Sequence, residues 1–151
     1  AGGQALDLAM VGGHPTEAEL LRMQTMKTGA LIRAAVLMGA QAGDWTNLPD
    51  EGRSGLALYS QALGLAFQVV DDILDCTQET AVLGKTAGKD EKDDKPTWVS
   101  ILGLEGAKKK AEELRAEAQF GLDLVAKTEG LAPDATKRLG EIADYVLNRS
   151  F

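Results

Sequence analysis

Three residue types that build special sites are scarce in this chain. Cys76 is the single cysteine of 151 residues, which excludes an internal disulfide. The single histidine, His14, precedes Pro15 in a Gly-rich stretch and is more typical of a turn than of a metal ligand. Aromatic residues make up only 5% of the chain, while Ala, Leu, Glu and Lys are abundant. This mixture favours helices over strands.

Long apolar runs and excess positive charge are also missing. No apolar run approaches the about 18 residues of a membrane-spanning helix, so we expect no membrane span. The formal net charge is −7, from 16 basic and 23 acidic residues, which argues against nucleic-acid binding because phosphate backbones are recognised by clustered Lys and Arg. A lone cysteine beside an acidic run fits a reducing compartment, and we expect a cytoplasmic protein.

Helical periodicity organises the rest of the sequence, and no segment alternates with a period of two. Thr16 and Glu19 form a capping-box pattern after the Gly12–Pro15 break. The residues between Leu56 and Leu74 are apolar nearly all round, which predicts a central buried helix. We therefore predict an all-α helical bundle in a single domain, residues 1–151. The expected helices are the tail of one ending near residue 8, then 16–41, 50–76 or beyond, 99–104, 105–127 and 133–149, with a polar loop over 83–98.

An acidic run lies within the segment predicted as the central helix. Gln68, Asp71, Asp72 and Asp75 follow a spacing of i, i+3, i+4 and i+7, so a helix places them on one face. Clustered carboxylates on a largely apolar helix repel one another unless a cation neutralises them. Mg²⁺ prefers carboxylate oxygens and is often completed by substrate phosphates. The run therefore predicts a site for Mg²⁺, with Mn²⁺ as an alternative, held by Asp71, Asp72 and Asp75. A solvated acidic face is the competing interpretation.

Two further segments could bind an anion. In Lys27-Thr28-Gly29 the ammonium and hydroxyl groups could contact an oxyanion, and the mid-helix glycine suggests a kink or a close approach. A surface lysine beside a packing glycine is the alternative. In the loop, Gly84-Lys85-Thr86 lacks the first glycine of a phosphate-binding P-loop, and no strand precedes it. Lys85 and Lys95 could still close over a phosphate group, although a simple solvated loop explains them as well.

Together these motifs resemble the trans-type polyprenyl diphosphate synthases, most of all the bacterial farnesyl diphosphate synthase (geranyltranstransferase) branch. Six blocks in the family's order and spacing carry the resemblance: Gly3-Gln4-x-Leu6-Asp7, Lys27-Thr28-Gly29, Gly64-x-x-Phe67-Gln68-x-x-Asp71-Asp72-Ile73-Leu74-Asp75, Gly84-Lys85-x-x-Gly88-x-Asp90, Lys95-x-Thr97 and Leu102-Gly103-Leu104-Glu105. Asp71 to Asp75 looks like the family's second aspartate-rich motif. The resemblance implies the C-terminal half of the all-helical isoprenoid synthase fold.

The resemblance also implies a reaction in isoprenoid biosynthesis. Mg²⁺ turns the diphosphate of an allylic substrate into a leaving group, the allylic cation is attacked by the double bond of isopentenyl diphosphate, and a proton is lost. Asp71 would bind the bridging ion, with Asp72 and Asp75 supporting it. Lys27, Thr28, Gln68, Lys85 and Lys95 would contact or orient the allylic diphosphate.

The family's first aspartate-rich motif, the arginines after it and the isopentenyl diphosphate site have no counterpart in this sequence. With no initiator methionine, the chain reads as a piece of a longer protein. We expect that the whole protein is the prenyltransferase and a homodimer, and that these 151 residues alone are inactive. The alternatives are half of a terpene cyclase, a noncatalytic prenyl-synthase-like binding module and a plain acidic interaction domain.

Overall fold

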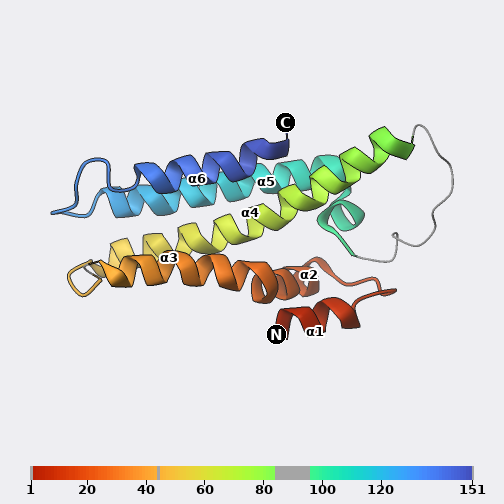
Figure 1. Cartoon of the computed structure of the whole chain (residues 1–151), viewed down its shortest axis with the longest axis horizontal. Coiled ribbons are helices and arrows are strands. Elements are labelled where there is room, and N and C mark those ends of the chain that lie inside the picture. The colour runs from red at the N-terminus through yellow and green to blue at the C-terminus, as the bar shows by residue number, and fades with distance from the viewer. Residues whose placement is uncertain (1, 44, 84–95, 151) are drawn as a thin grey trace.

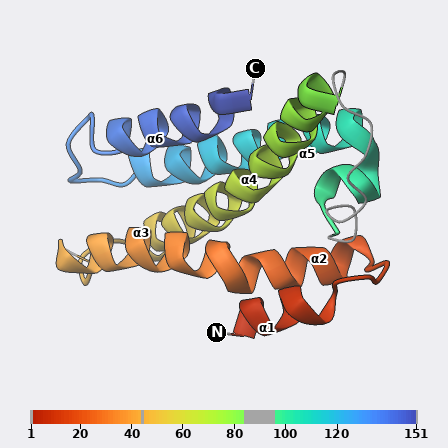
Figure 2. The ribbon, with the colours of Figure 1, turned by 45° about the vertical axis from the view of Figure 1, so that its right-hand side comes forward.

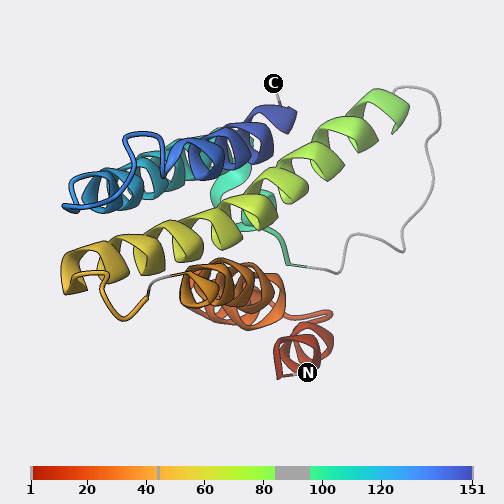
Figure 3. The ribbon, with the colours of Figure 1, turned by 60° about the vertical axis from the view of Figure 1, so that its left-hand side comes forward.

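The structure is an arrangement of helices around one long central helix. The computed structural model describes residues 2–43, 45–83 and 96–150, leaving aside the side chains of 79–83 and 150. Every regular element within these ranges is helical, which confirms the all-α prediction. The central helix α4 separates two groups of helices, as the three views show (Figures 1, 2 and 3). On one side lie α1 (Gly2–Ala9), α2 (Glu17–Gln24) and α3 (Ala30–Ala42), and on the other α5 (Trp98–Ala126) and α6 (Lys137–Leu147), with α4 (Asp50–Leu83) between them.

The predicted capping box is present at the start of α2. The backbone N–H of Thr16 donates to Glu19 Oε2 at 2.8 Å, and the backbone N–H of Glu19 donates to Thr16 Oγ1 at 3.3 Å. The helix predicted over 16–41 runs from Glu17 to Ala42, but it is not uniformly α-helical. A π-helical segment, η1 (Thr25–Gly29), joins α2 to α3. It contains the Lys27-Thr28-Gly29 motif, where the glycine had suggested a kink.

The central position predicted for α4 is confirmed. Its apolar side chains from Leu56 to Ile73 form the middle of the core, and Tyr59, Ala66, Val69, Val70 and Ile73 are fully buried. The Tyr59 hydroxyl donates to the carbonyl oxygen of Leu139 at 2.7 Å, which ties α4 to α6. Burial raises the pKa of Tyr59 to about 12.

Helix α4 approaches α5 closely through a pair of glycines. A Cβ atom added to Gly121 would lie 2.6 Å from the Gly55 carbonyl oxygen and 2.8 Å from the backbone nitrogen of Tyr59. No side chain larger than hydrogen fits there without movement of the backbone. The two helices can therefore pack backbone to backbone at the Asp50 end of α4.

The break that the sequence predicts between residues 104 and 105 lies one position earlier. Gly103 has a φ of 73°, inside the region that favours glycine, and it kinks α5 without ending it. The last helix begins at Lys137 rather than at Pro133, because backbone hydrogen bonds from Ala135 to Ala132 and from Lys137 to Asp134 form turns first. The short segment η2 (Asn148–Ser150) follows α6.

One expectation about the core is wrong. The Leu and Met positions between residues 20 and 38 have a helical spacing that predicts core packing rather than a cofactor site, and Leu20 and Met23 are buried. In contrast, Leu31 is 73% exposed and Met38 is 66% exposed, and α3 contributes no buried residue. Among the described helices, none combines the length and apolarity that a membrane span requires.

Candidate functional site

The acidic run occupies the last turns of α4 for which side chains are described. Asp71 and Asp75 are exposed, and Gln68 is half-buried. The two exposed aspartates are one helical turn apart, with a rise of about 6 Å between them. The helix is buried on its other faces, where Val69, Val70 and Ile73 enter the core. The predicted concentration of carboxylates on one accessible face is therefore real for Asp71 and Asp75.

Asp72 points in a different direction. Its Oδ2 atom accepts a hydrogen bond from the backbone N–H of Trp98 at 2.8 Å and one from Gln24 Nε2 at 3.5 Å. Trp98 is the first residue of α5, so this carboxylate supplies an acceptor to a free N–H at a helix N-terminus, where negative charge is favourable. Burial raises the pKa of Asp72 to about 6, although the hydrogen bonds from Trp98 and Gln24 act in the opposite direction.

The described residues contain no group of three or more His, Cys, Asp or Glu side chains placed to hold a metal ion. Of the three expected ligands, Asp72 is engaged with Trp98 of α5, and the Mg²⁺ site of Asp71, Asp72 and Asp75 stays a prediction. Asp71 and Asp75 still offer two accessible carboxylates, one turn apart. This donor set fits Mg²⁺, which is commonly bound by one or two carboxylates together with water and substrate phosphates.

The π-helical segment η1 lies alongside the same part of α4. Gln24, just before η1, contacts Asp72, while a Cβ atom added to Gly64 would lie 2.9 Å from the Cα atom of Gly29, the last residue of η1. The two contacts mean that η1 runs antiparallel to α4 between residues 64 and 72. Lys27 and Thr28 are thus brought next to the turn of α4 that carries Gln68. Both side chains are half-buried.

Lys27 forms an ion pair with α1. Its Nζ atom lies 2.6 Å from Asp7 Oδ2, and the Asp7 side chain is only 9% exposed. One turn earlier in α1, a Cβ atom added to Gly3 would lie 2.3 Å from the backbone nitrogen of Lys27. The spacing of Gly3 and Asp7 therefore allows the backbone of α1 to touch η1 while its carboxylate holds the lysine.

The other two predicted anion-binding residues, Lys85 and Lys95, lie outside the described residues. Pro96, the first described residue after them, is buried, and Thr97 caps α5. Of the eight predicted site residues, the structure thus brings together Lys27, Thr28, Gln68 and Asp71 to Asp75 at one end of the molecule.

Sequence reasoning gave no separate role to Asp7, Gln24 or Trp98. Gln24 is 4% exposed and Trp98 fully buried, and the indole Nε1–H of Trp98 donates to Gln24 Oε1. For Gln24, the available signal was its polar side chain between Met23 and Met26 on an apolar stripe. For Asp7 the signal was its position four residues after Gly3.

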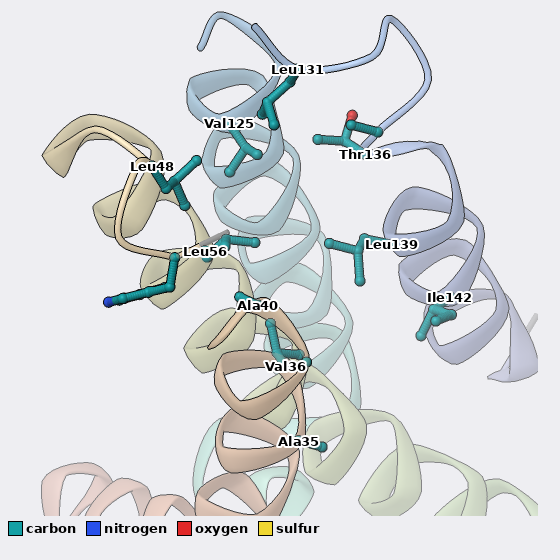
Figure 4. A pocket seen from close by; sticks show the side chains of 13 residues that line it. Ala35, Val36, Ala40, Leu48, Leu56, Val125, Leu131, Thr136, Leu139 and Ile142 are labelled. Carbon is teal, nitrogen blue, oxygen red and sulfur yellow. The ribbon is translucent and has the colours of Figure 1, made fainter. Parts of the chain in front are cut away.

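An apolar cavity of about 520 Å³ opens at the other end of α4 (Figure 4). Val36 and Ala40 of α3, Leu56 of α4, and Leu139 and Ile142 of α6 line it, together with Leu48 and Leu131. Its described lining contains no titratable side chain. The cavity can hold an apolar group, but its described lining offers no charged side chain for a diphosphate or a metal ion. A smaller cavity of about 290 Å³ lies beside η1, lined by residues that include Met26, Arg33, Gln61 and Leu65.

Comparisons with known proteins identify the family of this chain. The polyprenyl synthetase family model matches residues 1–125. Farnesyl diphosphate synthase of Escherichia coli (strain K12) is 44% identical over 152 residues, covering 99% of this chain and 48% of that protein. The chain thus spans about half the length of the curated relatives it matches.

Two solved structures extend the comparison to the fold. The apo structure of an FPP/GFPP synthase from Zymomonas mobilis matches with a TM-score of 0.71 and 33% identity, covering 96% of this chain and 44% of that one. A Helicobacter pylori geranyltransferase complexed with magnesium and isoprenyl diphosphate matches with a TM-score of 0.67 and 33% identity, covering 97% and 45%. The family model, the identities and the shared fold together establish that this chain belongs to the polyprenyl synthetase family.

Proposed function

We propose that this chain is part of a Mg²⁺-dependent prenyltransferase that condenses an allylic diphosphate with isopentenyl diphosphate. The observation that carries the proposal is the placement of two accessible carboxylates, Asp71 and Asp75, on the turns of α4 next to η1. The same end of the molecule therefore offers oxygen ligands for a divalent ion and, from Lys27 and Thr28, donors for phosphate oxygens. The Helicobacter pylori relative, complexed with magnesium and isoprenyl diphosphate, supports this choice of ligand.

Each residue has a defined task in the proposed reaction. Asp71 and Asp75 ligate the divalent ion, which when bound supplies positive charge to the diphosphate leaving group. Lys27, Thr28 and Gln68 donate hydrogen bonds to the allylic diphosphate and stabilise the charge that develops as the C–O bond breaks. Asp7 holds the Lys27 ammonium from the side of α1. Lys85 and Lys95 remain predicted diphosphate contacts.

The proposal extends to the whole protein. We place its reaction in the cytoplasm, because a single cysteine is typical of a reducing compartment. Homodimerisation remains a prediction. Isopentenyl diphosphate binding and product chain length are assigned to no residue of this chain.

A chimera tests the proposal. The matching portion of the Escherichia coli farnesyl diphosphate synthase would be replaced by these 151 residues, and condensation of radiolabelled isopentenyl diphosphate with geranyl diphosphate would be measured in Mg²⁺. We expect turnover by the chimera and none by the 151-residue chain alone. Asp71→Ala should lower kcat/KM of the chimera by about 100-fold or more, because a charge acting directly on the leaving group is lost. Glu117→Ala, which removes an exposed carboxylate in the middle of α5, is the matched control.

Two results would overturn the proposal. A folded chimera that neither turns over substrate nor binds Mg²⁺ with inorganic pyrophosphate would favour the noncatalytic binding module. Equal activities of the Asp71→Ala and Glu117→Ala chimeras would remove the acidic run from the reaction and favour a plain interaction domain.

A further inference from the structure

Three residues from separate helices form a closed hydrogen-bonded ring beside the acidic run. Gln24 Oε1 accepts from the indole Nε1–H of Trp98, Gln24 Nε2 donates to Asp72 Oδ2 at 3.5 Å, and the backbone N–H of Trp98 donates to the same Oδ2 at 2.8 Å. The ring joins the end of α2, the acidic turn of α4 and the start of α5. Gln24 is 4% exposed and Trp98 is 0% exposed, so the ring is closed off from water on the side of these two residues.

The chemistry of the three groups allows only one sense of hydrogen bonding around the ring. An indole N–H can only donate and an ionised carboxylate can only accept, so the amide of Gln24 must turn its oxygen to Trp98 and its nitrogen to Asp72. Removing a hydrogen-bond partner costs a buried polar group more free energy than it costs an exposed one. The ring therefore resists rotation of any of its members. Gln24 bonds the other two residues through two different side-chain atoms, Oε1 to Trp98 and Nε2 to Asp72.

The ring fixes two things that bear on the acidic face. It turns the Asp72 carboxylate towards α5, so that Asp71 and Asp75 are the members of the run left accessible. It also attaches α4 to the residue directly before η1, the segment in which Lys27 and Thr28 lie. A shift of Gln24 would therefore move the anion-binding donors relative to the carboxylates.

We propose that Gln24 is a positioning residue of the metal and diphosphate site, acting through Trp98 and Asp72 to set the spacing between η1 and the acidic turn of α4. This inference rests on the proposed function. Gln24 itself touches neither metal nor substrate. Its effect is to hold Asp72 against α5 and to keep Asp71 and Asp75 accessible to an ion beside Lys27 and Thr28.

A second contact between α2 and α5 provides a matched control. On the outer side of Trp98, Lys110 Nζ lies 5.6 Å from the indole ring centroid and 3.4 Å from Glu17 Oε1. This pair also joins α2 to α5, but it makes no contact with Asp72 in the described part of the chain. Glu17→Gln therefore weakens an α2–α5 contact without disturbing the ring.

The test uses Gln24→Met, Gln24→Glu, Gln24→His and Glu17→Gln in the chimera described above. Two quantities are measured on the folded fraction: affinity for Mn²⁺ in the presence of inorganic pyrophosphate, from the electron paramagnetic resonance signal of free Mn²⁺, and the Mg²⁺ concentration at half-maximal rate. Gln24→Met removes both hydrogen bonds. Gln24→Glu keeps the acceptor for Trp98 and replaces the donor to Asp72 by a second carboxylate, in a side chain of the same size. Gln24→His restores one donor and one acceptor.

We expect Gln24→Met and Gln24→Glu to weaken Mn²⁺ binding about tenfold or more and to raise the Mg²⁺ requirement by a similar factor, as changes in residues that orient metal ligands do. Gln24→His should recover most of the loss, and Glu17→Gln should bind Mn²⁺ as the unchanged chimera does. A merely structural role would lower the thermal midpoint of the Gln24 variants and leave both metal measurements unchanged, which would overturn the inference while the proposed function stands. An unchanged chimera that fails to bind Mn²⁺ and to turn over would instead overturn the proposed function itself.

Discussion

The two ends of α4 are held in place by different kinds of interaction. At the acidic end, polar groups from three helices meet in the Gln24–Trp98–Asp72 ring, and Trp98 is fully buried. At the other end, α4 meets α5 through the bare backbones of Gly55 and Gly121, and an apolar cavity of about 520 Å³ separates α3 from α6. Directional hydrogen bonds fix orientation at the end where we propose that a metal ion and a diphosphate bind. Non-directional apolar contact is enough where nothing charged is held.

The largest expected difference between the two ends comes from truncating one side chain at each. Trp98→Ala should cost about 3–5 kcal/mol of unfolding free energy, because it leaves a cavity and unpaired polar groups in a fully buried position. Ile142→Ala, in the wall of the apolar cavity and 48% exposed, should cost less than about 1 kcal/mol. Urea unfolding followed by far-ultraviolet circular dichroism measures both. Equal losses would mean that the two ends are equally well packed, and the contrast would not hold.

Two glycine substitutions examine the backbone contact at the apolar end. Gly121→Ala should cost about 1–3 kcal/mol, since the new Cβ would lie 2.6 Å from the Gly55 carbonyl oxygen. Gly39→Ala in α3 meets nothing within 4 Å and should instead stabilise the protein by up to about 1 kcal/mol through helix propensity. Because the substitution is the same, the difference between the two urea midpoints isolates the packing cost. Stabilisation by both would show that α4 and α5 can separate without penalty.

The smallest effect expected over any single pH unit concerns Asp72. Burial raises its pKa from the usual 3.8 to about 6. Between about pH 4 and about pH 6, the folded state therefore holds a proton that the unfolded state has already released. Stability should therefore fall as the pH rises from about 4 to about 6, by at most about 1.4 kcal/mol per pH unit, and then level off. Asp72→Asn should remove this slope. The measurement is the difference in unfolding free energy between wild type and Asp72→Asn, taken as a function of pH in metal-free buffer. This difference cancels contributions from other carboxylates such as Glu19. A difference independent of pH would contradict the assignment.

The sequence predicted the elements well where a local signal exists. Thr16 and Glu19 encode a cap whose partners lie three residues apart, and the apolar run to Leu74 can only be buried if it is central. The start of the last helix was placed too early because Pro133 suits both a helix and the turn that precedes Lys137. The exposure of Leu31 and Met38 was missed, because an apolar side chain on a helix does not reveal whether a neighbouring segment covers it.

The site was predicted only in part for a similar reason. Spacing placed Asp71, Asp72 and Asp75 on one face, but neighbouring positions on that face differ by tens of degrees around the helix axis. Which of them faces solvent and which faces α5 depends on how α4 is rotated in the bundle. That rotation is set by Gly64 against Gly29 and by Trp98, contacts between residues distant in sequence. No local pattern encodes them.

The π-helical segment η1 also determines which way the side chains of the following helix, α3, point. A π turn accommodates one residue more than an α-helical turn, which rotates the downstream helix by about 100° about its axis. The side of α2 that carries Leu20 and Met23 is therefore not continued by α3 in the same direction. Deleting a single residue between Thr25 and Gly29 would bring the two helices into one uninterrupted phase. The side chain of Thr28 would then point in a different direction, and Leu31 would lie beside a different neighbour. One inserted amino acid therefore sets a fixed rotation of α3 relative to α2 about the helix axis.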